Sequence, residues 1–233
     1  MDTLVTYERD GALATIAMDD GKVNALSLPM LRQLDAAFDR AQADHAVVVL
    51  TGRDGVFSAG FDLPALRAGG PEAEAMLFAG FELAERILSF STPVLIGCTG
   101  HAVAMGVFLL LSADYRVGVS GPYRITANEV AIGLTMPHAA VEICRQRLTP
   151  AHFNRAVVLA EVYAPVDAVD AGFLDRVVTP SELGDVVRTS AVALAGLDMA
   201  AHAATKQRAR SQSLTLVRAA IEADEVELRR GAA

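Results

Sequence analysis

A nearly uncharged stretch in the middle of the chain, residues 97–116, constrains the fold more than any other part of the sequence. Three glycines, Gly97, Gly100 and Gly106, lie where a strand would pass into a helix. Glycine lets the backbone approach a bound group closely, and the first N–H groups of a helix have no partner within it. The pattern predicts a buried helix whose N-terminus faces an anion or a polarised carbonyl.

A membrane-spanning helix is the alternative for this stretch. Its densest apolar part, residues 102–111, contains ten residues, whereas a bilayer needs about 20. No cluster of Lys or Arg flanks it in the way that orients a membrane span. The length therefore favours a helix buried in the protein core, and a membrane is not expected as a partner.

Composition narrows the class of protein. A chain of 233 residues, 52% of them hydrophobic, is long enough to bury a large core in one domain. The net charge of −8 argues against nucleic acid as a partner, because phosphate binding needs a basic surface. Cys98 and Cys144 lie in apolar segments without metal-ligand spacing, so we expect reduced core thiols and no metal site. The charged N-terminus lacks the apolar segment of a signal peptide, which makes the cytoplasm the expected location.

Strands and helices alternate along the first half of the chain. Short alternating or β-branched segments predict strands at residues 4–7, 13–18, 46–51, 93–98, 115–119 and 123–126. Helical periodicity predicts helices from Ser27, from near Pro64 and over 73–89, with loops at 52–63 and 67–71. Beyond Leu134 we expect one short strand, 175–178, among helices at 139–147, 150–160, 165–171, 181–197 and about 214–230. The order predicts an α/β core with a helical C-terminal part.

Two segments, residues 46–63 and 92–106, share a plan of buried strand, glycine-rich turn and helix. In open α/β sheets, ligands bind at the carboxyl ends of the strands. If the two turns converge, one N–H from each would point at a common acceptor, which is the geometry of an oxyanion hole. Strand, turn and helix with glycine is also ordinary architecture, so this pattern alone leaves both interpretations open.

Five motifs resemble the enoyl-CoA hydratase/isomerase, or crotonase, superfamily in order and spacing: GKVNALS, FSAGFDL, GHAVAMG continuing to SADYR, NEVAIGL and AVDAGFLDRVV. The resemblance implies the α/β crotonase (ClpP-like) fold, built of repeated ββα units with a helical C-terminal region. It further implies a core with an acyl-CoA site over residues 1–190 and an oligomerisation or lid region over 191–233. A homotrimer or dimer of trimers, an acyl-CoA or enoyl-CoA thioester as ligand, and no cofactor other than the CoA of the substrate are also implied.

The same resemblance assigns the oxyanion hole to the backbone N–H groups of Phe61 and Met105. Where this chain has Met105 between Ala104 and Gly106, the family commonly has three glycines. The added bulk predicts a different acyl shape or activity. Residues that match the substrate-binding and CoA-binding part of the family are Lys22, Val23, Ala25, Ala59, Gly60, Leu63 and Phe108. Lys22 is a candidate for a CoA phosphate, although a lysine in an exposed loop is more often only solvated.

Glu129 is the candidate catalytic residue. Hydratases of the family use two glutamates, whose positions correspond here to Phe108 and Glu129. A phenyl ring can neither activate water nor transfer a proton. One carboxylate in apolar surroundings, with a raised pKa, is enough to move a proton between two carbons. This pattern resembles the Δ3,Δ2-enoyl-CoA isomerase branch and predicts conversion of a 3-enoyl-CoA to a 2-enoyl-CoA. The alternatives are a hydratase with unusual water activation and a non-catalytic acyl-CoA-binding protein.

Other polar residues near the predicted site have structural interpretations. His101 and His138 have no paired aspartate nearby in the sequence, and such histidines are usually structural. Asp62 is expected to cap the helix that follows it, and Asp114 is expected to end the central helix. Ser58 has no apparent His and Asp partners, so a nucleophilic triad is not expected.

Overall fold

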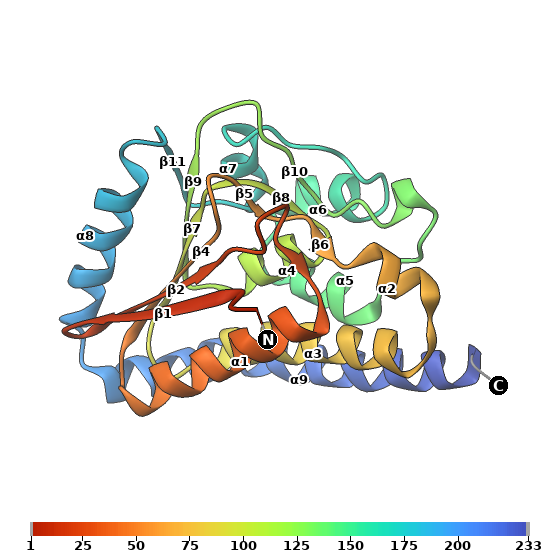
Figure 1. Cartoon of the computed structure of the whole chain (residues 1–233), viewed down its shortest axis with the longest axis horizontal. Helices are drawn as coiled ribbons and strands as arrows, with labels where there is room; N and C mark the ends of the chain where they lie inside the picture. The colour runs from red at the N-terminus through yellow and green to blue at the C-terminus, as the bar shows by residue number, and fades with distance from the viewer. Residues whose placement is uncertain (1, 232–233) are drawn as a thin grey trace.

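The computed structural model describes residues 2–231 and contains one large sheet (Figure 1). Its six strands follow the order β1-β2-β4-β7-β9-β11. Their bounds are Val5–Asp10, Leu13–Met18, Val47–Thr51, Val94–Cys98, Tyr115–Val119 and Arg176–Val178. β1 and β2 form an antiparallel hairpin, and every other pairing in this sheet is parallel. Alternating strands and helices therefore produce the predicted α/β core.

Two small sheets lie beyond the carboxyl ends of β4 and β7. One joins β5 (Gly55–Ser58), β8 (Gly100–Val103) and β10 (Ile125–Thr126). The other pairs β3 (Ala25–Leu26) with β6 (Gly60–Phe61). The prediction of a continuous loop over 52–63 was therefore wrong. Strands of two to four residues are too short to show an alternating pattern.

Nine α-helices accompany the sheets within residues 2–231. Their bounds are Leu28–Ala43 (α1), Leu63–Ala68 (α2), Gly70–Ser89 (α3), Met105–Ser112 (α4), His138–Arg145 (α5), Pro150–Val157 (α6), Asp167–Ala171 (α7), Leu183–Ala195 (α8) and Met199–Gly231 (α9). A 3₁₀ turn covers Val130–Ile132. Only Gly69, at φ 67°, separates α2 from α3, so the predicted loop over 67–71 is a single-residue break that glycine makes possible.

The central helix α4 confirms the buried helix predicted from the apolar stretch. All eight of its residues are buried. The helix begins at Met105, whereas Gly97 lies in β7 and Gly100 in β8. No helix in the described part of the chain combines the length and the apolar character that crossing a membrane requires.

Hydrophobic residues cover both faces of the large sheet. Val48 and Leu50 of β4 belong to the main core with α1, α3, α4 and α5, while Val47 and Val49 belong to a smaller cluster under α8. This alternation explains the continuous apolar strand pattern, because both faces of the strand are buried. Cys98 and Cys144 are both buried free thiols, and burial raises the pKa of the Cys98 thiol to about 12.

The C-terminal helix α9 packs against α3 and α5 and runs along one side of the molecule (Figure 1). It begins at Met199, so the start predicted near residue 214 was wrong. Residues 199–213 are rich in alanine and charge and lack a strong apolar stripe; their contacts with distant residues, such as Lys206 with Asp114, are not visible in a local pattern. The predicted division at 190/191 falls within α8 and remains a prediction.

Candidate active site

The two glycine-rich turns converge in space. β4 and β7 are parallel neighbours, with Thr51 opposite Gly97 at their carboxyl ends. The chain after each strand reaches the start of α4, where a methyl group on Gly60 would lie 2.8 Å from Cβ of Ala104 and 3.3 Å from N of Met105. Gly60 adopts φ +89° at this contact, so the turn requires glycine for both its conformation and its close approach. The backbones that carry Phe61 and Met105 are thus side by side.

The start of α4 provides an unpaired donor at this junction. Ala104 precedes the helix with φ 50°, so the unusual backbone conformation falls on alanine and not on Met105. The N–H groups of Val107 and Phe108 both donate to the Ala104 carbonyl, at 2.8 and 3.2 Å. The N–H of Met105, the first residue of the helix, has no acceptor within α4. Replacing the family's glycine by methionine therefore leaves this main-chain donor in place.

A cavity of about 320 Å³ lies against this junction. Ala59, Phe61, Ala104, Phe108, Asn128 and Glu129 are among the residues that line it. The remaining wall is mostly apolar and consists of Leu63, Leu66, Leu77, Phe81, Ile132, Leu134, Thr135, Pro137 and Leu228. The fold brings Phe61, Ala104, which directly precedes Met105, and the predicted base Glu129 around one cavity.

Glu129 is a buried carboxyl group that faces mainly apolar side chains. Its exposed fraction is 7%, and its Oε2 atom has no hydrogen-bond partner among residues 2–231. Burial raises the pKa of this carboxyl to about 7, against a smaller opposite effect of its own backbone N–H. Among the described residues that line the cavity, Glu129 is the one acidic or basic side chain. A carboxyl group near pKa 7 can take up and release a proton at neutral pH.

An aromatic cluster occupies the side of the cavity where a second carboxylate would be needed for hydration. Phe108 stacks on Phe81 at a centroid distance of 6.1 Å, and Phe61 meets Phe81 edge to face, also at 6.1 Å. Phe108 is 1% exposed. This part of the wall is thus apolar and well packed, and it provides no group that activates water.

Sequence reasoning missed the side chains that α2, α3 and α9 add to the cavity. Leu77, Phe81 and Leu228 lie far from the recognised motifs in the sequence, and Leu66 lies three positions after the end of FSAGFDL. The buried stripe of α3 predicts that Phe81 faces inward, but not which other elements it meets. Leu228 comes from the C-terminal helix, 99 positions after Glu129 (228 − 129).

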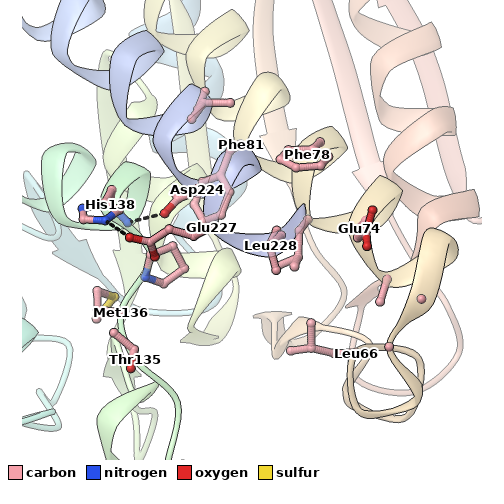
Figure 2. A pocket seen from close by; sticks show the side chains of 16 residues that line it. Leu66, Glu74, Phe78, Phe81, Thr135, Met136, His138, Asp224, Glu227 and Leu228 are labelled. Carbon is pink, nitrogen blue, oxygen red and sulfur yellow. Dashed lines mark hydrogen bonds and ion pairs between the residues drawn. The ribbon is translucent and has the colours of Figure 1, made fainter. Parts of the chain in front are cut away.

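A second, more open cavity of about 780 Å³ adjoins the first between α3, α9 and residues 135–138 (Figure 2). Leu66, Leu77, Phe81, Thr135, Pro137 and Leu228 line both cavities. Phe78, Met136 and Ile221 add apolar surface, while Glu74, Asp224 and Glu227 stand among the lining residues. An apolar chain that leaves the first cavity would therefore find further apolar surface here.

His138 connects α5 to α9 at the rim of this second cavity (Figure 2). Its Nε2 lies 3.2 Å from Oε1 of Glu227, and its backbone N–H donates to Asp224 at 2.8 Å. The second oxygen of Asp224 accepts from the N–H of Ala139 at 2.9 Å. The contact with Glu227 raises the pKa of His138. His138 therefore has the carboxylate partner that its neighbours in the sequence do not provide, and this partner comes from α9. The structural role of this histidine remains a prediction.

The other candidate polar residues also have structural contacts. Nδ1 of His101 accepts from the Arg124 N–H at 3.0 Å. Asp62 caps α2 by accepting from the Ala65 N–H. Ser58 Oγ donates to the Asn24 carbonyl at 2.7 Å and accepts from the Gly60 N–H, so it fixes the turn before Phe61.

Asp114 does more than end the central helix. It accepts from the Val94 N–H at 2.7 Å and pairs with Lys206 and Arg210 of α9 at 2.7 and 2.9 Å. Lys206 is 6% exposed. Burial lowers the pKa of Lys206 to about 8 even though Asp114 opposes the shift. The contact thus joins the end of α4 to α9 through a mostly buried ion pair.

The loop with Lys22, Val23 and Ala25, which is expected to hold CoA, is joined to Ala59 of the cavity wall by a backbone hydrogen bond. The Asp20 carboxylate accepts from the N–H groups of Lys22 and Ala25, and the Ala59 N–H donates to the Val23 carbonyl at 3.0 Å. Lys22 is exposed, and its ammonium group forms no ion pair with the residues that the structure describes. Arg53, which sequence reasoning missed, donates to the Lys22 carbonyl at 2.8 Å. Arg53 also pairs with Asp19 at 3.4 Å, so part of the positive charge at this edge is neutralised.

Within residues 2–231, no group of three or more His, Cys, Asp or Glu side chains is arranged to hold a metal ion.

Comparison with known families gives one match that spans nearly the whole chain. The family described as Enoyl-CoA hydratase/isomerase matches residues 8–229. A curated protein from Mycobacterium avium, named a probable enoyl-CoA hydratase, is 28% identical over 180 residues, which cover 76% of this chain and 70% of the relative.

Solved structures agree with this match. An enoyl-CoA hydratase/isomerase family protein from Pseudomonas syringae is 44% identical, with a TM-score of 0.95 over 97% of this chain and 98% of the other. A Mycobacterium tuberculosis protein, named an enoyl-CoA isomerase with one solved structure and a probable enoyl-CoA hydratase with another, is 46% identical, and the first structure gives a TM-score of 0.92 over 96% of this chain and 98% of the other. Relatives named as hydratases and as isomerases both occur, so their names alone do not choose between the two reactions.

Proposed function

The chain belongs to the enoyl-CoA hydratase/isomerase family, and we propose that it converts a 3-enoyl-CoA to the corresponding 2-enoyl-CoA. The observation that carries this proposal is the single carboxyl group of the cavity. Glu129 is buried, has a pKa raised to about 7 and lies in the same cavity as Phe61 and Ala104. The second acid/base position holds Phe108 in an aromatic stack.

The proposed reaction needs one base and one oxyanion hole. The Glu129 carboxylate removes a proton from C2 of the substrate, and the resulting dienolate places negative charge on the thioester oxygen. The N–H groups of Phe61 and Met105 stabilise that charge. Glu129 then returns the proton to C4, which leaves the double bond between C2 and C3. One proton is taken and one returned, so no water and no cofactor other than the CoA of the substrate is consumed.

The surroundings of the site agree with a thioester substrate. Lys22 lies at the edge where the CoA phosphates would enter and can pair with a phosphate group, whereas Arg53 beside it already pairs with Asp19 at 3.4 Å. The acyl chain would extend past Glu129 along the apolar wall toward the cavity between α3 and α9 (Figure 2). Trimeric assembly and a cytoplasmic location remain predictions from the family and the sequence.

An assay of both enoyl isomers tests the proposed function. We expect wild-type protein to convert 3-hexenoyl-CoA to 2-hexenoyl-CoA, as followed by chromatography, and to hydrate crotonyl-CoA no faster than the uncatalysed background. Hydration of crotonyl-CoA without isomerisation would instead show a hydratase that does not need a second carboxylate. Binding of hexanoyl-CoA by calorimetry, without conversion of either isomer, would show an acyl-CoA-binding protein.

The pH dependence of isomerisation provides a second prediction. Because burial raises the pKa of Glu129 to about 7, the fraction of the active carboxylate form should decrease as the pH falls through about 7. We expect kcat/KM to reach a plateau above about pH 8 and to fall about tenfold per pH unit well below pH 7. The profile is measured with 3-hexenoyl-CoA. A rate that stays constant down to about pH 5 would contradict a base with this raised pKa.

A further inference from the structure

One glycine in the interior of α3 has no role in the site described so far. Gly80 lies on the buried side of α3, on the same stripe as Met76 and Ala84. A glycine in the interior of a helix is destabilising relative to alanine. An isolated glycine at a buried helical position therefore indicates that another group occupies the space of its missing side chain.

The group that occupies this space is the ring of Phe61. A methyl group on Gly80 would lie 2.6 Å from both Cε1 and Cζ of Phe61, which is far closer than van der Waals contact allows. The same methyl would lie 3.4 Å from Sδ of Met105. The side chains of both proposed oxyanion-hole residues thus approach α3 at Gly80.

A ring displaced from this position has limited space available. Phe61 is half-buried and lines the cavity that contains Glu129. Phe81 lies edge to face with it at 6.1 Å and Met105 is fully buried, so the core around them is already filled. The Phe61 ring would therefore move into the cavity, in the part that would contain the acyl chain.

We infer that Gly80 is a positioning residue, which holds the Phe61 ring out of the acyl cavity and so determines which acyl chains fit beside Glu129. This inference rests on the proposed function, because it assigns the cavity to an acyl chain. A side chain at Gly80 would push the ring toward substrate carbons beyond C4. Substrates that end at C4 would avoid the ring.

Gly80→Ala tests this inference with two substrates. We expect kcat/KM for 3-decenoyl-CoA to fall about tenfold, mainly through KM, because the displaced ring takes up space that a long acyl chain needs. The value for 3-butenoyl-CoA, which has no carbon beyond C4, should change by less than about twofold. The double variant Gly80→Ala/Phe61→Leu should regain the 3-decenoyl-CoA activity of Phe61→Leu alone, since leucine keeps the N–H group but removes the ring.

Gly184→Ala is the matched control. Gly184 lies in α8, and a methyl group there would meet no heavy atom within 4 Å. We expect this variant to keep at least the wild-type Tm and both activities. If Gly80→Ala behaves like Gly184→Ala, Gly80 has no positioning role. If Gly80→Ala alone does not fold, folding and activity of the double variant support the inference, and an unfolded double variant overturns it.

Failure of the proposed function would be recognised separately. If wild-type protein converts neither substrate but binds decanoyl-CoA, the isomerase proposal fails. The same variants are then compared by the Kd of decanoyl-CoA, and an unchanged Kd in Gly80→Ala overturns the inference. Wild-type protein that neither binds nor converts an acyl-CoA overturns both proposals.

Discussion

Glu129→Gln should reduce kcat for isomerisation of 3-hexenoyl-CoA by about 10²–10⁴-fold, which is the usual contribution of a positioned acid/base group. Glutamine keeps the size of the side chain but cannot accept the proton from C2. KM should change little, because the neutral amide leaves the apolar wall and the proposed oxyanion hole in place. The comparison is made by steady-state kinetics at about pH 8, where the wild-type carboxyl is mostly ionised.

The same variant should be more stable than the wild type at alkaline pH. The folded-state pKa of Glu129, about 7, lies above its ordinary value of 4.5, so folding favours the protonated form. The contribution of the protonated Glu129 carboxyl to the free energy of unfolding is complete below about pH 4.5 and is lost as the pH rises through about 7. We therefore expect Glu129→Gln to raise Tm at about pH 8 by at least about 2–4 °C, the shift that 1 kcal/mol gives in a chain of this size.

A matched control is Glu222→Gln, at an exposed position of α9. It should change neither kcat nor Tm appreciably, since exposed substitutions usually stay within about 0.5 kcal/mol. Undiminished isomerase activity in Glu129→Gln would remove this glutamate from the mechanism. Loss of activity accompanied by a lower Tm at both acid and alkaline pH would indicate damage to the fold instead of loss of a base.

Asp114→Asn should lower the free energy of unfolding by about 3–5 kcal/mol, as expected when one partner of a buried ion pair is removed. The substitution leaves Lys206, which is 6% exposed, without its counter-charge. It also weakens the contact with Arg210. Because both cations belong to α9, the loss should loosen the docking of this helix. Urea unfolding monitored by circular dichroism measures the change.

Two further variants separate a buried charge from an ordinary ion pair. Asp114→Asn combined with Lys206→Met should be less destabilised than Asp114→Asn alone, since no unpaired ammonium group remains in the interior. Asp10→Asn removes a partner of the exposed pair with Arg188, in which the side chains are 67% and 62% exposed, and should cost at most about 1 kcal/mol. If Asp114→Asn and Asp10→Asn lower the free energy of unfolding equally, the ion pair between Asp114 and Lys206 does not hold α9 in place.

The catalytic candidates could be proposed from sequence because they lie in short motifs. Glu129 follows Asn128 in an otherwise apolar segment. Phe61 follows Gly60, and a glycine at such a position is typical of a tight turn. What sequence could not show was that Phe81 of α3 and Leu228 of α9 complete the cavity. A hydrophobic stripe predicts that a helix has a buried face, but not which distant residues this face meets.

The sequence by itself determined the elements whose pattern repeats over neighbouring residues. The β-branched run of β4, the helical periodicity of α1 and the apolar length of α4 each depend on residues a few positions apart. The tertiary structure alone decided the packing of Phe61 against Gly80, the pairing of Asp114 with Lys206 and the early start of α9 at Met199. These features depend on contacts between residues far apart in the chain, and such contacts form only when the whole core closes.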